Sequence, residues 1–248
     1  MKILLPPSET KRPGGSGAPL AIDSLALPAL AAERAAVVTA LVELAADPAA
    51  ARRVHKISDR QLGDIDHNAA LGSAPTMAAV DRYTGVLYDA LDATSLDAVA
   101  RRWLDRHVWI HSAPFGPIAA LDAIPTYRLA AGTSLPGIAP LRRHWALATS
   151  EAMAQDAPGF VLDLRSEAYV ALGPVPASVP YAYVRVVTGE GRALNHFNKK
   201  AKGELVRALA EDRPRVRSLA ALQGWARARS ITIRQAEQAG VLELVTET

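Results

Sequence analysis

Four short apolar runs, separated by longer helical stretches, constrain this chain more than any other feature of its sequence. The runs are Lys2–Leu5, His107–His111, Phe160–Leu164 and Tyr181–Val187. Each has the length and the apolar or alternating character of a β-strand. Between them, apolar residues recur at helical spacing, as in Ala29–Ala45 and Leu141–Met153. Strands interleaved with helices predict an α/β fold, and we expect one compact domain over residues 1–248 with a mixed sheet flanked by helices.

Polar loops follow three of these strands directly. Ser8 and Lys11 follow the first strand, Ser112 the second, and Ser166 with Glu167 the third. If the sheet is largely parallel, the three loops lie at one edge, where open α/β sheets usually bind ligands. Taken singly these residues are less informative, because Ser8 can cap a turn and Glu167 can pair with a neighbouring arginine. Together they predict a polar pocket.

A lysine cluster is the main local chemical signal. The chain has 28 Lys and Arg residues but only six lysines, and Lys199, Lys200 and Lys202 fall within four residues. The apolar spacing through Leu209 predicts a helix with these lysines opposite its buried stripe. Gly203, near the middle of the basic face, would let another backbone or a phosphate come close. Two interpretations stay open: a solvated basic face, or an anion-binding face.

The distribution of charge favours a polyanionic partner for the C-terminal region. Between residues 192 and 234 there are eleven Lys or Arg against three acidic residues, a net charge of +8, whereas the rest of the chain has −5. Such asymmetry indicates nucleic acid or a phosphorylated small molecule, without telling the two apart.

Several protein classes are excluded by what the sequence lacks. There is no cysteine, so disulfides and thiolate metal sites are excluded. No apolar run is long enough for a signal peptide or a membrane span, and we expect a cytoplasmic protein without membrane contact. No phosphate-loop, serine-hydrolase or zinc-protease motif is present. His107 and His111 lack a carboxylate at ligand spacing, so we expect neither a metal nor a cofactor.

Residues of about 48–71 outline a helix-hairpin-helix element. Asp47 and Pro48 have the pattern of an N-cap and first helical residue, and a glycine-containing turn separates two helical stretches. The basic residues around this turn are Arg52, Arg53, Lys56 and Arg60. Such an element offers turn amides to DNA phosphate, while the alternative interpretation is an ordinary connection between two helices.

Taken together, the short motifs resemble the YaaA family of peroxide stress proteins, also named UPF0246. They span nearly the whole chain in the order of the family. The motifs are Leu4–Lys11, Lys56–Asp59, Tyr83–Gly85 with Tyr88, Pro114–Ile118, Leu121–Asp122, Pro125–Leu129, Trp145, Leu164–Tyr169 and Phe197–Gly203. Five of the six lysines lie inside them.

The resemblance implies a single α/β domain of an unusual fold, with a helix-hairpin-helix-like element and a positively charged cleft. In the family that cleft is associated with double-stranded DNA, and the cellular role with limiting free iron and oxidative DNA damage. By position, the hairpin falls on Lys56 to Ile65. The basic cleft falls on Lys199, Lys200 and Lys202, with Lys11 and Arg128. We expect Ser8, Tyr127 and Tyr169 in the pocket.

Two functional hypotheses remain. The first is a DNA-binding protein of the peroxide stress response that contacts phosphates with little base readout. The second is an enzyme for a phosphorylated or otherwise anionic small molecule, such as a nucleotide or a biosynthetic intermediate. Ser166, Glu167 and His196 would then be the catalytic candidates. The enzyme hypothesis predicts one compact cleft that joins Ser8, Arg128, Glu167 and Lys200.

Overall fold

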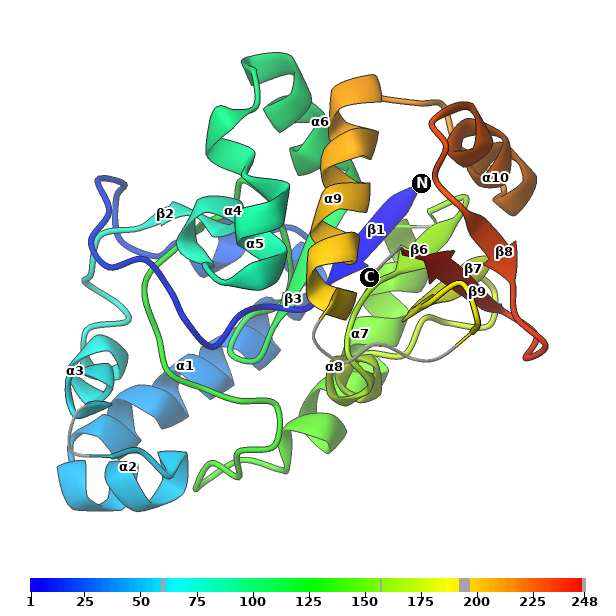
Figure 1. Ribbon diagram of the computed structural model, residues 1–248. Helices are drawn as coiled ribbons and strands as arrows, with labels where there is room; N and C mark the ends of the chain where they lie inside the picture. Colours follow the sequence, from blue (N-terminus) through cyan, green and yellow to red (C-terminus); the bar gives the residue numbers. More distant parts are fainter. Residues whose placement is uncertain (59–60, 157, 192–196, 247–248) are drawn as a thin grey trace.

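The computed structural model describes residues 1–58, 61–156, 158–191 and 197–246, and it shows an α/β domain (Figure 1). Its strands are β1 Lys2–Leu5, β2 Met77–Ala78, β3 Val108–Ser112, β4 Gly116–Ala119, β5 Ala123–Ile124, β6 Val161–Asp163, β7 Tyr181–Val187, β8 Ile233–Gln235 and β9 Val241–Val245. Its α-helices are α1 Ala31–Ala45, α2 Pro48–His55, α3 Gly63–Ala69, α4 Ala79–Arg82, α5 Val86–Leu91, α6 Ala98–His107, α7 Leu141–Asp156, α8 Glu167–Leu172, α9 Phe197–Asp212 and α10 Leu219–Ala228.

A seven-stranded mixed sheet forms the centre of the domain, in the order β4-β3-β1-β6-β7-β9-β8. The five inner strands are parallel, and β4 and β8 pair antiparallel at the two edges. All four predicted strands are therefore confirmed, and the loops after β1, β3 and β6 leave the sheet at the same edge. A separate two-stranded ribbon pairs β2 with β5.

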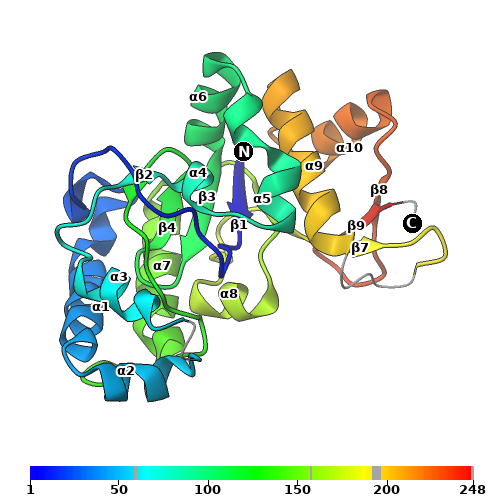
Figure 2. The same cartoon turned by 60° about the vertical axis from the view of Figure 1, so that its left-hand side comes forward.

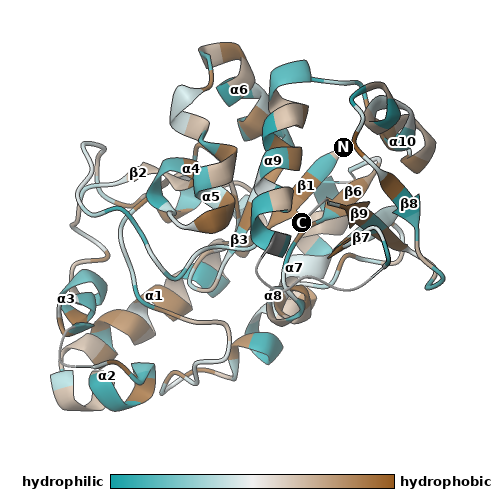
Figure 3. Ribbon diagram, viewed as in Figure 1, coloured by the Kyte–Doolittle hydropathy of each residue, from teal (hydrophilic) through white to brown (hydrophobic). Residues whose placement is uncertain are grey.

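Helices cover both faces of the central strands. Figures 1 and 2 place α5, α6 and α9 on one side of the sheet and α7 and α8 on the other. Ile3, Leu4 and Leu5 of β1 are wholly buried because they lie between these two layers. In Figure 3 the central strands are mainly hydrophobic, and helices such as α9 carry both hydrophilic and hydrophobic residues.

Helix α9 packs so closely on α5 that a side chain at the crossing would not fit. A Cβ at Gly203 would overlap the main-chain carbonyl of Leu87 and crowd the side chain of Ala90. Of the two uses expected for this glycine, the approach of another backbone is therefore the one found. Arg207 strengthens the same contact, because its Nη1 donates to the carbonyls of Leu91 and Asp92 at the end of α5, both at 3.1 Å.

A buried arginine ties α1 to the β4 edge of the sheet. The guanidinium of Arg34 donates from Nε to Phe115 O at 2.8 Å and from Nη2 to Pro117 O at 3.0 Å. The same Nη2 donates to Ala26 O at 2.5 Å. Arg34 is wholly buried, so these carbonyls satisfy a charge that water does not reach.

Three segments depart from a simple alternation of strand and helix. After Arg213 the chain forms α10 and then the β8–β9 hairpin. The segment after β3 turns at once into β4, and residues 79–91 form two short helices that separate at Gly85. β9 pairs with the distant β7 and Gly85 lies against the loop after β1, whereas β4 pairs with the adjacent β3. None of the helices in the described residues is both long and apolar enough to cross a bilayer.

Candidate functional site

The loop after β1 forms one wall of a small polar cavity. Its Ser8 and Thr10 hydroxyls lie 3.3 Å apart, and the Thr10 hydroxyl donates to the carbonyl of Thr84 at 3.3 Å. Gly85 stands opposite with a φ of +95°, and a Cβ there would approach both hydroxyls to 3.4 Å. A glycine is favoured at this position by its positive φ.

Lys199, in the first turn of α9, completes this cavity of about 290 Å³. Glu9 also lines it and places one carboxylate among the polar groups. Lys200 is exposed next to Lys199 and forms an i,i+4 ion pair of 3.6 Å with Glu204. The first turn of α9 has two lysines and no acidic residue. Because a helix N-terminus already carries partial positive charge, two lysines there concentrate positive potential instead of balancing it.

Lys11 lies beside this cavity, but its ammonium is held by the protein itself. Nζ donates to the carbonyls of Ser8 at 3.1 Å and Glu9 at 3.2 Å, and it lies 4.1 Å from the ring centroid of Tyr127. Burial, reinforced by the charge of Arg128, lowers the pKa of Lys11 to about 7. An amine with these partners anchors the loop after β1.

Four tyrosines lie beneath the loop after β1: Tyr83, Tyr88, Tyr127 and Tyr169. The hydroxyls of Tyr83 and Tyr127 are hydrogen-bonded at 2.8 Å, and the Tyr88 hydroxyl donates to Pro6 O at 2.7 Å. Burial raises the pKa of all four phenols, Tyr169 included, so they act as neutral hydrogen-bonding groups. Tyr127 is only 3% exposed and forms the floor beneath the loop.

Lys202 is separated from the other two lysines of the cluster. Its side chain is 5% exposed, and Nζ lies 5.7 Å from the ring centroid of Tyr183 in β7. Burial lowers the pKa of Lys202 to about 8, an effect that the charge of Asp163 opposes. The expected basic face with all three lysines is therefore wrong in this respect, because α9 is packed both on α5 and on β7 of the sheet.

The loops after β3 and β6 lie next to a buried network of charged and polar side chains instead of an open site. Arg165 donates to both carboxylate oxygens of Asp163, at 2.9 Å from Nε and 2.7 Å from Nη2. Its Nη1 lies 2.7 Å from Nδ1 of His111. Because a guanidinium only donates, this His111 nitrogen accepts and the ring is neutral. Burial and the charge of Arg165 lower the pKa of His111 well below its usual value.

Neither Ser166 nor Glu167 lines the cavity at Lys199. Ser166 precedes α8 without a side-chain capping bond, and Glu167 lines a different cavity, together with Asp163 and Tyr183. His196 lies outside the described residues. The single cleft expected to join Ser8, Arg128, Glu167 and Lys200 is thus divided, with Ser8 and Glu167 lining different cavities.

The two helices expected around residues 48–71 are present as α2 and α3. Asp47 caps α2, with its Oδ1 3.0 Å from the amides of Ala49 and Ala50, and Lys56 ends the helix exposed, with a φ of +51°. The amide of Ser58 donates to the Gln61 side chain at 3.1 Å, so an internal group takes this turn amide. Arg60 lies outside the described residues, and the hairpin stays a prediction.

Arg128 is fixed beside α3. Its amide donates to Asn68 Oδ1 at 2.8 Å, and its carbonyl accepts from Asn68 Nδ2 at 2.9 Å. Its Nε lies 4.0 Å from the Asp64 carboxylate. Arg128 therefore links α3 to the neighbourhood of Lys11, whose pKa its charge helps to lower.

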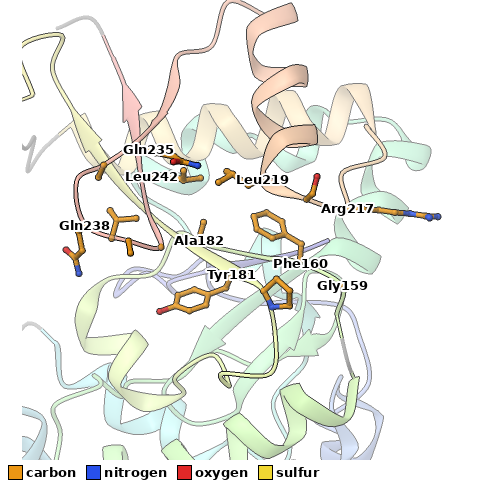
Figure 4. Close-up of a pocket in the computed structure, with 15 residues that line it drawn as sticks. Gly159, Phe160, Tyr181, Ala182, Arg217, Leu219, Gln235, Gln238 and Leu242 are labelled. Atoms are coloured by element: carbon orange, nitrogen blue, oxygen red, sulfur yellow. The ribbon is translucent and has the colours of Figure 1, made fainter.

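An apolar cavity of about 550 Å³ lies at the opposite edge of the sheet, at the amino ends of β6 and β7. Phe160, Leu219 and Leu242 supply its walls, and the Arg217 side chain extends away from them (Figure 4). This cavity is lined mainly by apolar groups and lies far from the polar loops, so it does not form part of the candidate site.

Comparison with known proteins assigns the chain to a family. A family model described as peroxide stress protein YaaA matches residues 1–229. The chain belongs to the YaaA family of peroxide stress proteins. Within it, UPF0246 proteins of Streptomyces coelicolor and Corynebacterium efficiens are each 45% identical over 216 residues, which cover 84% and 85% of this chain and 82% and 85% of theirs. A UPF0246 protein of Corynebacterium glutamicum strain R is 40% identical over 240 residues, 95% of each chain.

Sequence reasoning missed some of the residues that form the candidate site of this YaaA-family protein. Thr10 and Gly85 line the cavity with Ser8 and Lys199, although only their neighbours were singled out. Their signal was present, because both lie in family motifs next to chosen residues. The pairing of Asp163 and Arg165 with His111 had no sequence signal, since the histidine is 54 residues away from the arginine.

Proposed function

We propose that this protein binds the phosphate backbone of DNA during peroxide stress, through Lys199, Lys200 and the cavity at the end of β1. The observation that carries the proposal is the first turn of α9, where two lysines and no acid sit at the positive end of a 16-residue helix. This arrangement costs helix stability, by roughly 0.3–1 kcal/mol per misplaced charge, unless an anion offsets it.

The cavity beside Lys199 suits a phosphate group. The Ser8 hydroxyl can donate to a phosphate oxygen, and the ammonium of Lys199 supplies the charge. A volume of about 290 Å³ accommodates one phosphate with its sugar, and Lys200 lies beside it for the next. Contacts of this kind depend on backbone charge and carry little sequence information.

A salt-dependent titration of a random-sequence duplex tests the proposal. We expect the double variant Lys199→Ala/Lys200→Ala to bind more weakly and to reduce the slope of log K against log salt by about 2, because two phosphate contacts are lost. The matched control is Arg102→Ala/Arg106→Ala on α6, which removes the same charge from exposed positions at the far end of the sheet. Unchanged affinity and slope in the lysine variant would overturn the proposal.

A second candidate function is an enzyme for an anionic small molecule at the same cavity. It is supported by Lys11, because a buried amine with a pKa of about 7 can act as a base or nucleophile at neutral pH. The test is incubation with a mixture of phosphorylated metabolites, followed by mass spectrometry. Turnover by the protein that is lost in Lys11→Met supports this function, and an unchanged mixture rejects it.

A further inference from the structure

A second polar cavity, of about 450 Å³, lies on the open face of β7. It is enclosed by the start of α7, by α8, by the turn at Pro174 and Val175, and by the tip of the β8–β9 hairpin. It shares no lining residue with the cavity at Lys199. The hairpin wall, from Gln238 to Val241, also lies beyond residue 229, where the match to the family model ends.

Two tyrosines form the floor of this cavity. Tyr181 and Tyr183 are two residues apart in β7, so both point to the same face of the sheet. Tyr181 is 47% exposed, which is unusual for so large a ring, and Figure 4 shows it turned away from Leu219 and Leu242. Neighbouring aromatic rings with one accessible face are a stacking surface for a flat ligand ring.

Charged groups of both signs surround the floor. Arg185 follows on the same face of β7, Arg142 comes from α7, and Glu167 comes from α8. None of the three forms an ion pair within the described part of the chain. Asp163 also lines the cavity, but Arg165 neutralises it. Among the lining residues, two guanidiniums and one carboxylate are therefore left to bind a ligand, and the Lys202 ammonium lies 5.7 Å from the Tyr183 ring.

We propose that this cavity binds a purine nucleoside monophosphate. The base stacks on Tyr181 and Tyr183, and Arg185 with Arg142 holds the phosphate, for which the planar guanidinium is suited. Glu167 accepts hydrogen bonds from N–H groups of the base; guanine presents two adjacent N–H donors to one carboxylate, whereas adenine presents its amino group alone.

The other ligand classes that fit the charges fit the rest less well. A free amino acid matches the mixed charges but leaves most of the tyrosine floor uncovered. A sugar phosphate uses the arginines but not the aromatic rings. The volume falls within the range of small-molecule sites, about 300–1,000 Å³. This site does not depend on DNA binding at α9, because none of its lining residues belongs to that helix.

Calorimetric titration of the full chain with guanosine monophosphate, adenosine monophosphate and ribose 5-phosphate tests the proposal. We expect saturable binding of the guanine nucleotide that is about tenfold tighter than binding of ribose 5-phosphate, because stacking contributes to the first alone. Tyr181→Ala should lose about the same factor, whereas Tyr181→Phe should retain binding because it keeps the ring. Glu167→Gln should bring the two nucleotides closer in affinity.

Two matched arginine variants test whether binding of the nucleotide depends on the positive charge in the cavity. Arg185→Ala should weaken binding of guanosine monophosphate about tenfold, and Arg102→Ala, an exposed arginine on α6, should not change it. Equal affinity for ribose 5-phosphate and the nucleotides, or full binding by Tyr181→Ala, would overturn the proposal. A duplex titration of the same variants separates this site from the proposed DNA surface, because none of these variants should change duplex binding.

Discussion

Gly203 of α9 lies directly against the main-chain carbonyl of Leu87 in α5, so the two helices meet backbone to backbone. Glycine in a helix interior costs about 1 kcal/mol relative to alanine. The close contact explains why that cost is accepted, since even a methyl group would force the helices apart. The crossing also fixes the position of α9, and therefore the position of Lys199 in its first turn.

We expect Gly203→Ala to destabilise the protein by about 1–3 kcal/mol, because the overlap with a rigid backbone outweighs the gain in helix propensity. The midpoint of urea unfolding measures the change. Gly224→Ala in α10 is the control: a Cβ there meets open space, so the same substitution should stabilise by about 0.5–1 kcal/mol. Equal effects at both positions would contradict the packing described for α5 and α9.

Removal of Arg165 should be among the most destabilising single changes in the chain. Arg165→Met leaves the carboxylate of Asp163 buried without its partner, and loss of one member of a buried ion pair costs about 3–5 kcal/mol. Urea unfolding again gives the free energy.

The double variant Asp163→Asn/Arg165→Met provides the comparison. Because it removes both charges, it should recover part of the stability lost in the single variant. If the double variant is as unstable as the sum of the two single variants, the pair does not act as a unit.

Lys202 should make stability rise with pH in the alkaline range. Its folded pKa of about 8 lies below the usual 10.5, so between these values the unfolded chain binds more protons than the folded one. Stability therefore increases as pH rises from about 8 to 10.5, and below pH 8 the full cost of burying the ammonium is present. The whole window corresponds to a change on the order of 3 kcal/mol.

Thermal unfolding at several pH values measures this effect. Lys202→Met should flatten the rise relative to the unaltered protein, and Lys200→Met, at an exposed position, should leave it unchanged. If the stability of Lys202→Met rises with pH by the same amount, the rise comes from other titrating groups.

Glu9 should weaken anion binding at the cavity beside Lys199. Its exposed carboxylate lines that cavity and repels a phosphate there. Glu9→Gln is therefore expected to tighten duplex binding about two- to fivefold at low salt, and the gain should shrink as salt rises. Asp23→Asn, at an exposed position that does not line this cavity, is the control in the same titration. Equal gains in both variants would reflect net charge alone.

The strands and their common edge could be predicted because the decisive information is local. Apolar runs such as Lys2–Leu5 specify strands wherever they occur, and the polar loops after them lie together as soon as the sheet is parallel. The capping of α2 by Asp47 was equally local. In contrast, β9 depends on pairing with β7 more than fifty residues away, so its short apolar run did not predict a strand.

The side chains of the site were harder to predict, because burial is a property of the assembled fold. Helical spacing placed Lys199, Lys200 and Lys202 on one face, but the spacing does not reveal that α9 has neighbours on two sides. Lys11 was expected to face an anion, yet two carbonyls of its own loop bind its ammonium. Residue type shows where basic side chains occur in the sequence, and packing decides which of their charges are accessible.

The contacts of Arg34 also bear on how this protein behaves at high concentration. Strand β4 is the outer strand on its side of the sheet, where unpaired carbonyls usually invite a strand from another molecule. Here Arg34 already binds the carbonyls of Phe115 and Pro117, and Pro117 has no N–H to offer. The guanidinium therefore takes the place of a neighbouring strand and protects this border against edge-to-edge aggregation.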